Sequence, residues 1–317
     1  MVRVATRGSD LARWQASRVA DRLRSAHPGL IVELVLVETS GDRRTDVPVW
    51  EMGGQGVFVK EVQAAVLDGR ADLAVHSAKD LPSATAPGLV LACVPERDDP
   101  ADALVGSTLA KLPAGALVAT GSVRRRAQLA WLRPDLTFTG LRGNIATRLA
   151  QAGPDRVVVV AAAALHRLGL LDRAAEILTP DVMLPQVAQG ALAVECRADD
   201  EEVIGLLHSI DDPRAHRTVN AERAFLARLG GGCDLPVGAL AVEAASGEIT
   251  VDGMLARADG HLLLRARRTG GPGDDPASVG AQLAGYLLDD AGGADLLDDA
   301  GGADLLAPDG GNPMTAR

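Results

Sequence analysis

The sequence predicts an α/β protein of two or three domains, the last of which is a separate α+β domain. Three observations support this prediction. The chain has 317 residues, which is too long for one typical hydrophobic core. Up to about residue 210, short runs of Val, Leu and Ala alternate with helical patterns, as in buried sheets covered by helices. After residue 212 the pattern changes to one long helix, three strand-like stretches and a last helix.

The elements of the α/β part follow from the spacing of apolar residues. Residues 2–6 form the first predicted strand, and Ser9 is expected to cap the helix that follows. The apolar positions of that helix are Leu11, Trp14, Val19 and Leu23. Further strands are expected at residues 31–37, 72–76, 89–94, 116–120 and 156–161. Helices are expected over residues 57–68, 123–132, 143–151 and 200–210.

The C-terminal domain begins at Asp212 and Pro213, because Asp is a favoured N-cap and Pro is favoured at the first helical position. The helix is expected to run through Leu229 and to end at the glycines of residues 230–232. Strands are expected at residues 237–243, 248–255 and 262–268, followed by a helix near 276–290.

The acidic tail contains a tandem repeat, because LLDDAGGAD at residues 287–295 recurs at residues 296–304. Two copies are too few for a repeat architecture, which needs at least three units to bury a core. We interpret the second copy as a local duplication that extends a frayed terminus and carries no function.

Composition excludes several classes of function. Aromatic residues make up 2% of the chain and the formal net charge is −10, so binding of nucleic acid is not expected. The N-terminus lacks the apolar segment of a signal peptide, and the longest apolar run, residues 157–165, is too short for a membrane span. We expect a soluble, cytoplasmic protein. No long exposed apolar stripe demands a dimer, so a monomer is expected.

The three cysteines are too few and too far apart for a disulfide framework or a zinc site, and no metal is expected. Cys93 and Cys196 adjoin apolar strands and are interpreted as small buried hydrophobic residues. Cys233 follows three glycines, and an exposed thiol beside backbone amides can be nucleophilic, although Asp234 opposes a lowered pKa. A covalent role for Cys233 and a plain loop cysteine both stay open at this point.

Positive charge is concentrated in residues 120–148, where six arginines stand against one acidic residue. The motif TGSVRRR follows a predicted strand and opens a helix, so Ser122, backbone N–H groups and the first arginines converge on one point. In LRGNIATR, Asn144 and Arg148 lie on one helical face. A solvated basic face is the alternative. Two such elements at strand ends favour a ligand with several negative charges.

The segment AVHSAKDLP places polar residues at the end of a predicted strand. A carboxylate there, such as Asp80, can accept N–H bonds and stabilise a nearby cation. A turn aspartate that bonds its own backbone is the plain alternative. His76 is interpreted as structural, because no His or Cys stands at metal-ligand spacing from it.

A glycine-rich loop, GGQGVFVK at residues 53–60, leads into the predicted helix at 57–68. It lacks the Gly-Lys-Ser/Thr ending of a phosphate-binding loop, so a nucleotide site is not expected. We interpret the loop as a lid that carries Gln55 and Phe58.

Taken together, eight segments resemble the hydroxymethylbilane synthase (porphobilinogen deaminase) family from end to end, in the expected order. They are ATRGS (5–9), GGQGVFVKE (53–61), DLAVHSAKDLP (72–82), ATGSVRRRAQL (119–129), LRGNIATRL (141–149), LPQVAQGALAVECR (184–197), NAERAFLARLGGGCDLPVG (220–238) and the strand–helix close. Each motif is weak alone, and together they are highly specific.

The resemblance implies a transferase with two α/β lobes like those of periplasmic binding proteins and a smaller C-terminal α+β domain. The implied bounds are 1–95 with 191–210, 100–188 and 213–307, with a tail at 308–317. Such enzymes join four porphobilinogen molecules head to tail, release ammonia and make the linear tetrapyrrole hydroxymethylbilane, in tetrapyrrole and heme biosynthesis. The growing chain is primed on a dipyrromethane cofactor that is bound as a thioether.

Each site residue is then assigned by its match to the family's motifs. Cys233 matches the residue that attaches the cofactor. Asp80 matches the catalytic carboxylate, which bonds the pyrrole N–H groups and stabilises the azafulvene-like cation as ammonia leaves. The positions that match binding of acetate and propionate groups or lie near the pocket are Arg7, Ser9, Lys79, Ser122, Arg124, Arg125, Arg142, Arg148, Arg167 and Gln189.

The sequence departs from the family's pattern in three places. Gln55 and Glu51 stand where relatives often carry lysines, so the charge of the lid differs. The run Ala-Leu-His-Arg at residues 164–167 replaces Gly-Leu-Lys-Arg, and Gly121 replaces a frequent Ser.

Two other functions stay open on the residues alone. A two-lobed cytoplasmic anion-binding protein without catalysis shares the α/β lobes and the arginines, but gives no reason for Gly-Gly-Gly-Cys in a third domain. An acyl- or phosphoryl-transferring enzyme with Cys233 as nucleophile needs a nearby histidine, and His216 is the nearest in sequence.

Overall fold

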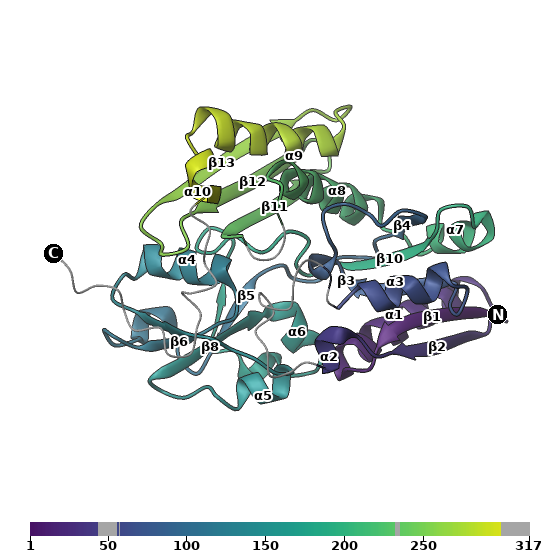
Figure 1. Cartoon of the computed structure of the whole chain (residues 1–317), viewed down its shortest axis with the longest axis horizontal. Helices are drawn as coiled ribbons and strands as arrows, with labels where there is room; N and C mark the ends of the chain where they lie inside the picture. Colours follow the sequence, from purple (N-terminus) through teal and green to yellow (C-terminus); the bar gives the residue numbers. More distant parts are fainter. Residues whose placement is uncertain (44–55, 57, 232–234, 299–317) are drawn as a thin grey trace.

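Three sheets organise the chain, as Figure 1 shows for the computed structural model, which describes residues 1–43, 56, 58–231 and 235–298. Two five-stranded sheets form the two lobes, and a three-stranded sheet forms the C-terminal domain above them. The predicted fold class, two α/β lobes and a smaller α+β domain, is confirmed. The sequence-based assignments for Gln55, Glu51, Cys233 and Asp234 lie outside the described residues.

The first lobe is a mixed sheet in the order β2-β1-β3-β10-β4. Its strands are β1 (Val2–Arg7), β2 (Val32–Val37), β3 (Leu73–Ser77), β4 (Leu89–Cys93) and β10 (Leu192–Arg197). The first three are parallel, and β10 runs antiparallel between β3 and β4. The chain therefore leaves this lobe after β4 and returns to it as β10. The helices of the lobe are α1 (Asp10–Ala26), α2 (Ser40–Arg43), α3 (Lys60–Leu67) and α7 (Glu201–His208).

The second lobe repeats this plan in the order β7-β6-β8-β5-β9. Its strands are β5 (Asp102–Val105), β6 (Leu117–Ala119), β7 (Thr137–Thr139), β8 (Arg156–Ala161) and β9 (Glu176–Leu178). Strands β6, β7 and β8 are parallel, and β5 is antiparallel to both β8 and β9. The helices are α4 (Val123–Leu132), α5 (Ile145–Leu149) and α6 (Ala162–Arg167).

The C-terminal domain packs two helices against an antiparallel sheet. Helix α8 (Pro213–Arg228) begins where predicted, because the Asp212 side chain accepts hydrogen bonds from the N–H groups of Arg214 and Ala215. The strands are β11 (Val237–Glu243), β12 (Ile249–Ala256) and β13 (Leu263–Gly270). The chain then forms α9 (Pro276–Gly285), a π-helical turn (Tyr286–Asp290) and α10 (Ala294–Asp298).

The predicted helices and strands are present, with ends that shift by a few residues. The helix predicted over residues 143–151 is shorter, because Asn144 caps it and Gly143 adopts a positive φ of 96°. Strands β5, β7, β9 and β10 and helix α6 were not predicted as separate elements. Strands β7 and β9 have three residues each, and α6 continues the apolar run of β8 without a break in composition.

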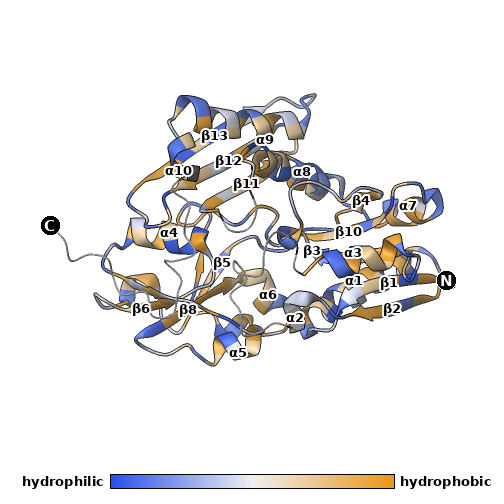
Figure 2. Cartoon of the chain, in the orientation of Figure 1, coloured by the Kyte–Doolittle hydropathy of each residue, from blue (hydrophilic) through white to orange (hydrophobic). Residues whose placement is uncertain are grey.

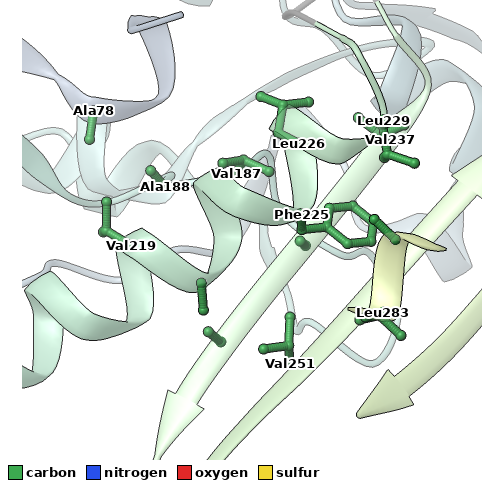
Figure 3. Close-up of a cluster of buried hydrophobic side chains, with 14 of the residues drawn as sticks. Ala78, Val187, Ala188, Val219, Phe225, Leu226, Leu229, Val237, Val251 and Leu283 are labelled. Atoms are coloured by element: carbon green, nitrogen blue, oxygen red, sulfur yellow. The ribbon is translucent and has the colours of Figure 1, made fainter. Parts of the chain in front are cut away.

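The core of the C-terminal domain continues into the first lobe. Phe225 of α8 is fully buried and packs with Val251 and Leu283, and the same cluster includes Ala78 and Ala188 (Figure 3). Apolar residues concentrate on the strands of both lobes, as the orange segments of Figure 2 show. Within the described residues, no helix is both long enough and apolar enough to cross a membrane.

Candidate active site

The two lobes are joined by two neighbouring crossover segments, residues 94–101 and 185–191, which are bonded to each other. The N–H of Asp98 donates to the carbonyl of Gly190 (3.1 Å), and Arg97 Nε donates to the carbonyl of Gln189 (2.9 Å). Gly190 has a φ of +86°, and a Cβ there would collide with the Asp98 carbonyl. This close approach requires glycine and holds the crossovers side by side.

Asp80 lies at the end of β3, in a 3₁₀ turn (Ala78–Asp80) that continues the strand. It lines a pocket in the first lobe, formed by Arg7, Ser9, Leu11, Ala12, Gln15, Phe58, Val59, Val75, His76, Ser77 and Asp80. None of the other described residues donates a hydrogen bond to the Asp80 carboxylate. Asp80 therefore differs from a turn aspartate that bonds its own backbone, and its oxygens can accept bonds from a ligand.

The other wall of this pocket comes from the end of β1. The Arg7 guanidinium lies over the Phe58 ring, with 4.2 Å from its carbon to the ring centroid, which is a cation–π contact. Ser9 caps α1, and its Oγ accepts a bond from the N–H of Ala12 (3.4 Å). Phe58, predicted as part of a lid, thus stacks on one of the predicted binding arginines.

Lys79 adjoins Asp80 and points toward the second crossover, where its Nζ donates to Gln189 Oε1 (3.4 Å). Burial and the positive charge of Arg125 lower the pKa of the Lys79 ammonium to about 8. The carboxylates of Asp80 and Asp102 act in the opposite direction, since they favour the charged form. Lys79 is therefore an ammonium at neutral pH that loses its proton in mildly basic solution.

Arg124 and Arg125 bind a carboxylate of the protein itself. Arg124 Nη2 donates to Asp102 Oδ2 (2.8 Å), and Arg125 donates to Asp102 Oδ1 through Nε (3.0 Å) and Nη2 (2.7 Å). Arg124 Nη1 and Arg125 Nη1 donate to the carbonyls of Leu184 and Val159. All three charged side chains are buried, with exposed fractions of 2%, 7% and 0%. The sequence suggested guanidinium groups open to a ligand. In the structure most of these donors are bonded within the protein, while Arg124 Nε has no hydrogen-bond partner among the described residues.

Although burial would raise the pKa of Asp102, the charges of Arg124 and Arg125 hold it far below its usual range. Burial in turn lowers the pKa of Arg124, although Asp102 opposes that shift. Asp102 is consequently a permanent anion at the start of β5. The sequence did not single it out, because one acidic residue before Ala-Leu-Val resembles a turn residue. Its burial and its closeness to the arginine pair become visible only in the structure.

The remaining residues of the second lobe lie on α4 and α5. Ser122 caps α4 and accepts a bond from the N–H of Arg125 (3.4 Å). Arg148 Nε donates to the carbonyl of Gly143 (2.7 Å). Burial and the nearby Arg125 lower the pKa of Arg148, while Asp80 of the first lobe raises it, and Arg142 lowers it. Arg148 therefore lies within range of the Asp80 charge.

Arg167 ends α6 and is fixed to the crossovers. Its Nη2 donates to the carbonyl of Gly190 (2.5 Å), its Nε lies 3.4 Å from Asp98 Oδ2, and its guanidinium lies 6.0 Å from the Trp14 ring centroid. Gln189 is fully buried, and its Nε2 donates to Asp102 Oδ1 (2.9 Å) and the carbonyl of Pro100 (2.7 Å). These two residues connect the lobes.

Cys93 and Cys196 are fully buried free thiols in the core of the first lobe, which confirms their interpretation as small hydrophobic residues. Burial raises the pKa of both thiols, that of Cys196 to about 11, so neither is a ready nucleophile. His76 is buried beside Glu195, with 3.2 Å between Nε2 and Oε2. Across the part of the chain that the structure describes, no cluster of His, Cys, Asp and Glu has the arrangement of a metal site.

Comparison with known proteins places this chain in a family. The family model described as "Porphobilinogen deaminase, dipyromethane cofactor binding domain" matches residues 2–205, and "Porphobilinogen deaminase, C-terminal domain" matches residues 216–289. This chain belongs to the porphobilinogen deaminase family. Among curated proteins named porphobilinogen deaminase, that of Roseiflexus sp. (strain RS-1) is 50% identical over 92% of this chain and 97% of its own length. That of Syntrophotalea carbinolica is 47% identical, over 93% and 94% respectively.

Among solved structures, that of a nutrient binding protein from Burkholderia cenocepacia bound to methionine aligns with this chain. The two are 13% identical, with a TM-score of 0.41, and the alignment covers 68% of this chain and 93% of that chain. A likeness this distant supports no functional conclusion.

The positive side chains near Lys79 and Arg148 fit the dipyrromethane cofactor of porphobilinogen deaminases. The described groups that act most strongly on Lys79 and Arg148 are Arg124, Arg125, Arg142, Asp80 and Asp102. With Lys79 and Arg148 themselves, that set holds five cations and two carboxylates. Positive charges gathered in one place attract a ligand that brings several carboxylates. Two linked pyrroles, each with an acetate and a propionate, have that chemistry.

Proposed function

We propose that this chain condenses four porphobilinogen molecules head to tail, with release of ammonia, and that Asp80 is its catalytic carboxylate. The observation that carries the proposal is the position of Asp80. It ends β3 in a pocket with Arg7 and lies within range of the charges of Lys79 and Arg148. Among the described residues that line the pocket, Asp80 is the one acid, and cationic side chains lie near it. The site therefore suits a ligand that has carboxylates at its edge and develops positive charge at its centre.

The cationic side chains and Asp80 have different roles in this proposal. Carboxylate groups of the substrate are bound by cationic side chains around Asp80, namely Arg7, Lys79, Arg142 and Arg148, with Ser9 and Ser122 as hydroxyl donors. The Asp80 carboxylate accepts the pyrrole N–H and stabilises the positive charge that spreads over the pyrrole nitrogen as ammonia leaves. Because that charge exists only late in the reaction, its stabilisation lowers the barrier more than it strengthens substrate binding.

Arg124 and Arg125 have a supporting role in this proposal. Most of their guanidinium donors are bonded to Asp102 and to backbone carbonyls, so their main contribution is positive potential near Lys79 and Arg148. Gln189 and Arg167 hold the crossovers and orient Lys79. Phe58 covers Arg7, and we propose the lid role for Phe58 and Gln55.

When bound, the dipyrromethane supplies the pyrrole on which the chain grows, and we propose that Cys233 holds it as a thioether. The enzyme is then a transferase that acts in the cytoplasm as a monomer on porphobilinogen, without nucleic acid or membrane. Attachment to a residue in the C-terminal domain lets the product lengthen while Asp80 stays at one fixed place.

Intact mass of the purified protein tests this function. Protein made in cells with the substrate pathway intact is expected to exceed the polypeptide mass by two linked pyrrole units. Cys233→Ser should abolish the adduct, because a serine alkoxide is far less available near neutral pH than a cysteine thiolate.

The buried cysteines provide matched controls. Cys93→Ser and Cys196→Ser should retain the adduct at some cost in stability, since both thiols lie in the core of the first lobe. A native protein with the bare polypeptide mass would instead favour an anion-binding protein or an enzyme with a free nucleophile. An adduct retained by Cys233→Ser would refute attachment at that residue.

A further inference from the structure

Asp102 occupies an unusual position for an acidic residue. It begins β5, directly after the first crossover, with no exposed surface, and its two oxygens accept bonds from three side chains. Oδ2 accepts from Arg124, and Oδ1 accepts from Arg125 and from Gln189 Nε2 (2.9 Å). One carboxylate thus joins helix α4 of the second lobe to the second crossover.

The bond from Asp102 determines how the Gln189 amide is oriented. Gln189 Nε2 donates both to Asp102 Oδ1 and to the carbonyl of Pro100, two acceptors that repel an amide oxygen. The amide oxygen therefore faces the other way, toward Lys79, whose Nζ donates to it at 3.4 Å. Since Lys79 directly precedes Asp80, a contact that starts in the second lobe ends beside the proposed catalytic carboxylate.

The same three charged residues, Asp102, Arg124 and Arg125 (the Asp102 triad), also act electrostatically on Lys79. Arg124 and Arg125 on α4 disfavour the ammonium, whereas Asp102 on β5 and Asp80 on the 3₁₀ turn favour it. Without the Asp102 carboxylate, two guanidinium groups would still act on Lys79, and one of the two carboxylates that favour its ammonium would be gone. Burial alone already disfavours the charged amine, so the balance is sensitive to this one acid.

We propose that Asp102 is a positioning residue for the condensation. From the second lobe it fixes Gln189, Arg124 and Arg125, and thereby holds Lys79 as an ammonium beside Asp80. Lys79 is then able to bind a substrate carboxylate at neutral pH. The role of Asp102 in the condensation rests on the proposed function. Its effect on the protonation state of Lys79 does not, and that effect can be measured without turnover.

The protonation state of Lys79 can be measured directly by NMR, because the chain contains few lysines. The chain has three lysines, Lys60, Lys79 and Lys111, so selective labelling with ¹³C and ¹⁵N gives three side-chain signals in an NMR spectrum. Lys60 and Lys111 are exposed and serve as internal references. A Lys79→Arg variant identifies the signal of Lys79. The full-length protein with its native cofactor content is titrated from pH 5 to 11.

In the native protein the Lys79 signal is expected to titrate near pH 8. In Asp102→Asn the midpoint should move to lower pH, because two arginine charges then lack their counter-charge. Arg125→Gln should move the midpoint to higher pH, since it removes a positive charge and leaves Asp102 paired with Arg124. This second variant tests the electrostatic effect of the Asp102 triad on Lys79 even if Asp102→Asn fails to fold.

Glu222→Gln is the matched control. Glu222 is another acid without exposed surface, paired with Arg97 (2.6 Å) and bonded to the N–H groups of Ala188 and Ala241. Its replacement should leave the Lys79 midpoint in place. An unchanged midpoint in Asp102→Asn, or in Arg125→Gln, would overturn the inference. So would an equal shift in Glu222→Gln, which would indicate general loosening. Wild-type adduct and condensation activity could persist in either case, so the proposed function is judged separately.

Discussion

At the scale of single residues, Arg125 shows how burial changes the contribution of one ion pair to the free energy of unfolding. Its guanidinium places Nε and Nη2 on Asp102 and Nη1 on the carbonyl of Val159, an arrangement that a lysine cannot reproduce. Arg125→Lys should lower the free energy of unfolding by about 1.5–3 kcal/mol, measured by urea denaturation. Arg267→Lys removes a similar fork on Asp252, but at 61% side-chain exposure, and should cost about 0–1 kcal/mol. Equal costs would show that the Asp102 pair contributes no more than a surface bridge.

Lys79 should make substrate capture depend on pH. Its pKa of about 8 means that the ammonium is present below that pH and lost above it. KM for porphobilinogen is therefore expected to rise as the pH passes from 7 to 9.5, with a smaller change in kcat. Lys79→Arg should remove the part of the rise that comes from this residue, because arginine stays charged throughout. An identical rise in both proteins would assign the pH dependence to the substrate or to another group.

At the scale of elements, the structure shows that the tail repeat contributes leucines to the core of the C-terminal domain, which the sequence did not predict. Leu287 and Leu288 of the first copy are buried in the core that contains Phe225, and so is Leu296, the first residue of the second copy. Deletion of residues 296–304 joins Asp295 to Leu305, so the chain again continues with two leucines. Activity and melting temperature should barely change. A large fall in either would show that residues of the second copy have a specific role beyond that of Leu296.

Elements with strong local signals were predictable from the sequence, and those defined by distant partners were not. Ser9 and Asp212 cap their helices as predicted, because side-chain capping is a local interaction. The bounds of strand β10 were not predicted beyond an apolar stretch before Cys196, since the strand contains the buried Glu195, whose partners Gln63 and His76 come from α3 and β3. Trp14 was expected on the buried face of α1, but it is 36% exposed and packs near Arg167 of the other lobe.

The site was predictable to a similar degree. The motif His-Ser-Ala-Lys-Asp and the family resemblance led to Asp80 and to the arginines around it. The partner of Arg124 and Arg125 was not predictable, because Asp102 lies on a different strand and reaches them only after the second lobe has folded. Pairing across a fold is a property of tertiary structure that spacing along the sequence does not encode.

For the whole molecule, we propose a division into residues 1–95 with 191–210, residues 100–188 and residues 213–307. The C-terminal unit shares one core with the first lobe, because the cluster that contains Val219 and Phe225 also includes Ala78 and Ala193. It is also tied to the first crossover by the buried pair of Glu222 and Arg97. We therefore expect the first lobe and the C-terminal unit to unfold in one transition in calorimetry. A C-terminal unit that melts separately would contradict this coupling.

The role of Asp80 is the central claim for the molecule as an enzyme. Asp80→Asn keeps the shape of the side chain and removes its charge, so turnover is expected to fall by about 10²–10³, as when one preorganised electrostatic group is lost. Asp80→Glu moves the carboxylate by one methylene and should be impaired without being inactive. Folding should change by about 1 kcal/mol or less, because Asp80 is a partly exposed turn residue.

The most direct test is single-turnover release of ammonia from porphobilinogen by Asp80→Asn protein that already carries its cofactor, as verified by intact mass. The comparison is with native protein of the same cofactor content, so differences in priming do not enter the rate. We predict release slower by about 10²–10³, with binding of porphobilinogen largely retained. A rate equal to that of the native protein would contradict the account and would leave Asp80 as a turn residue at the end of β3.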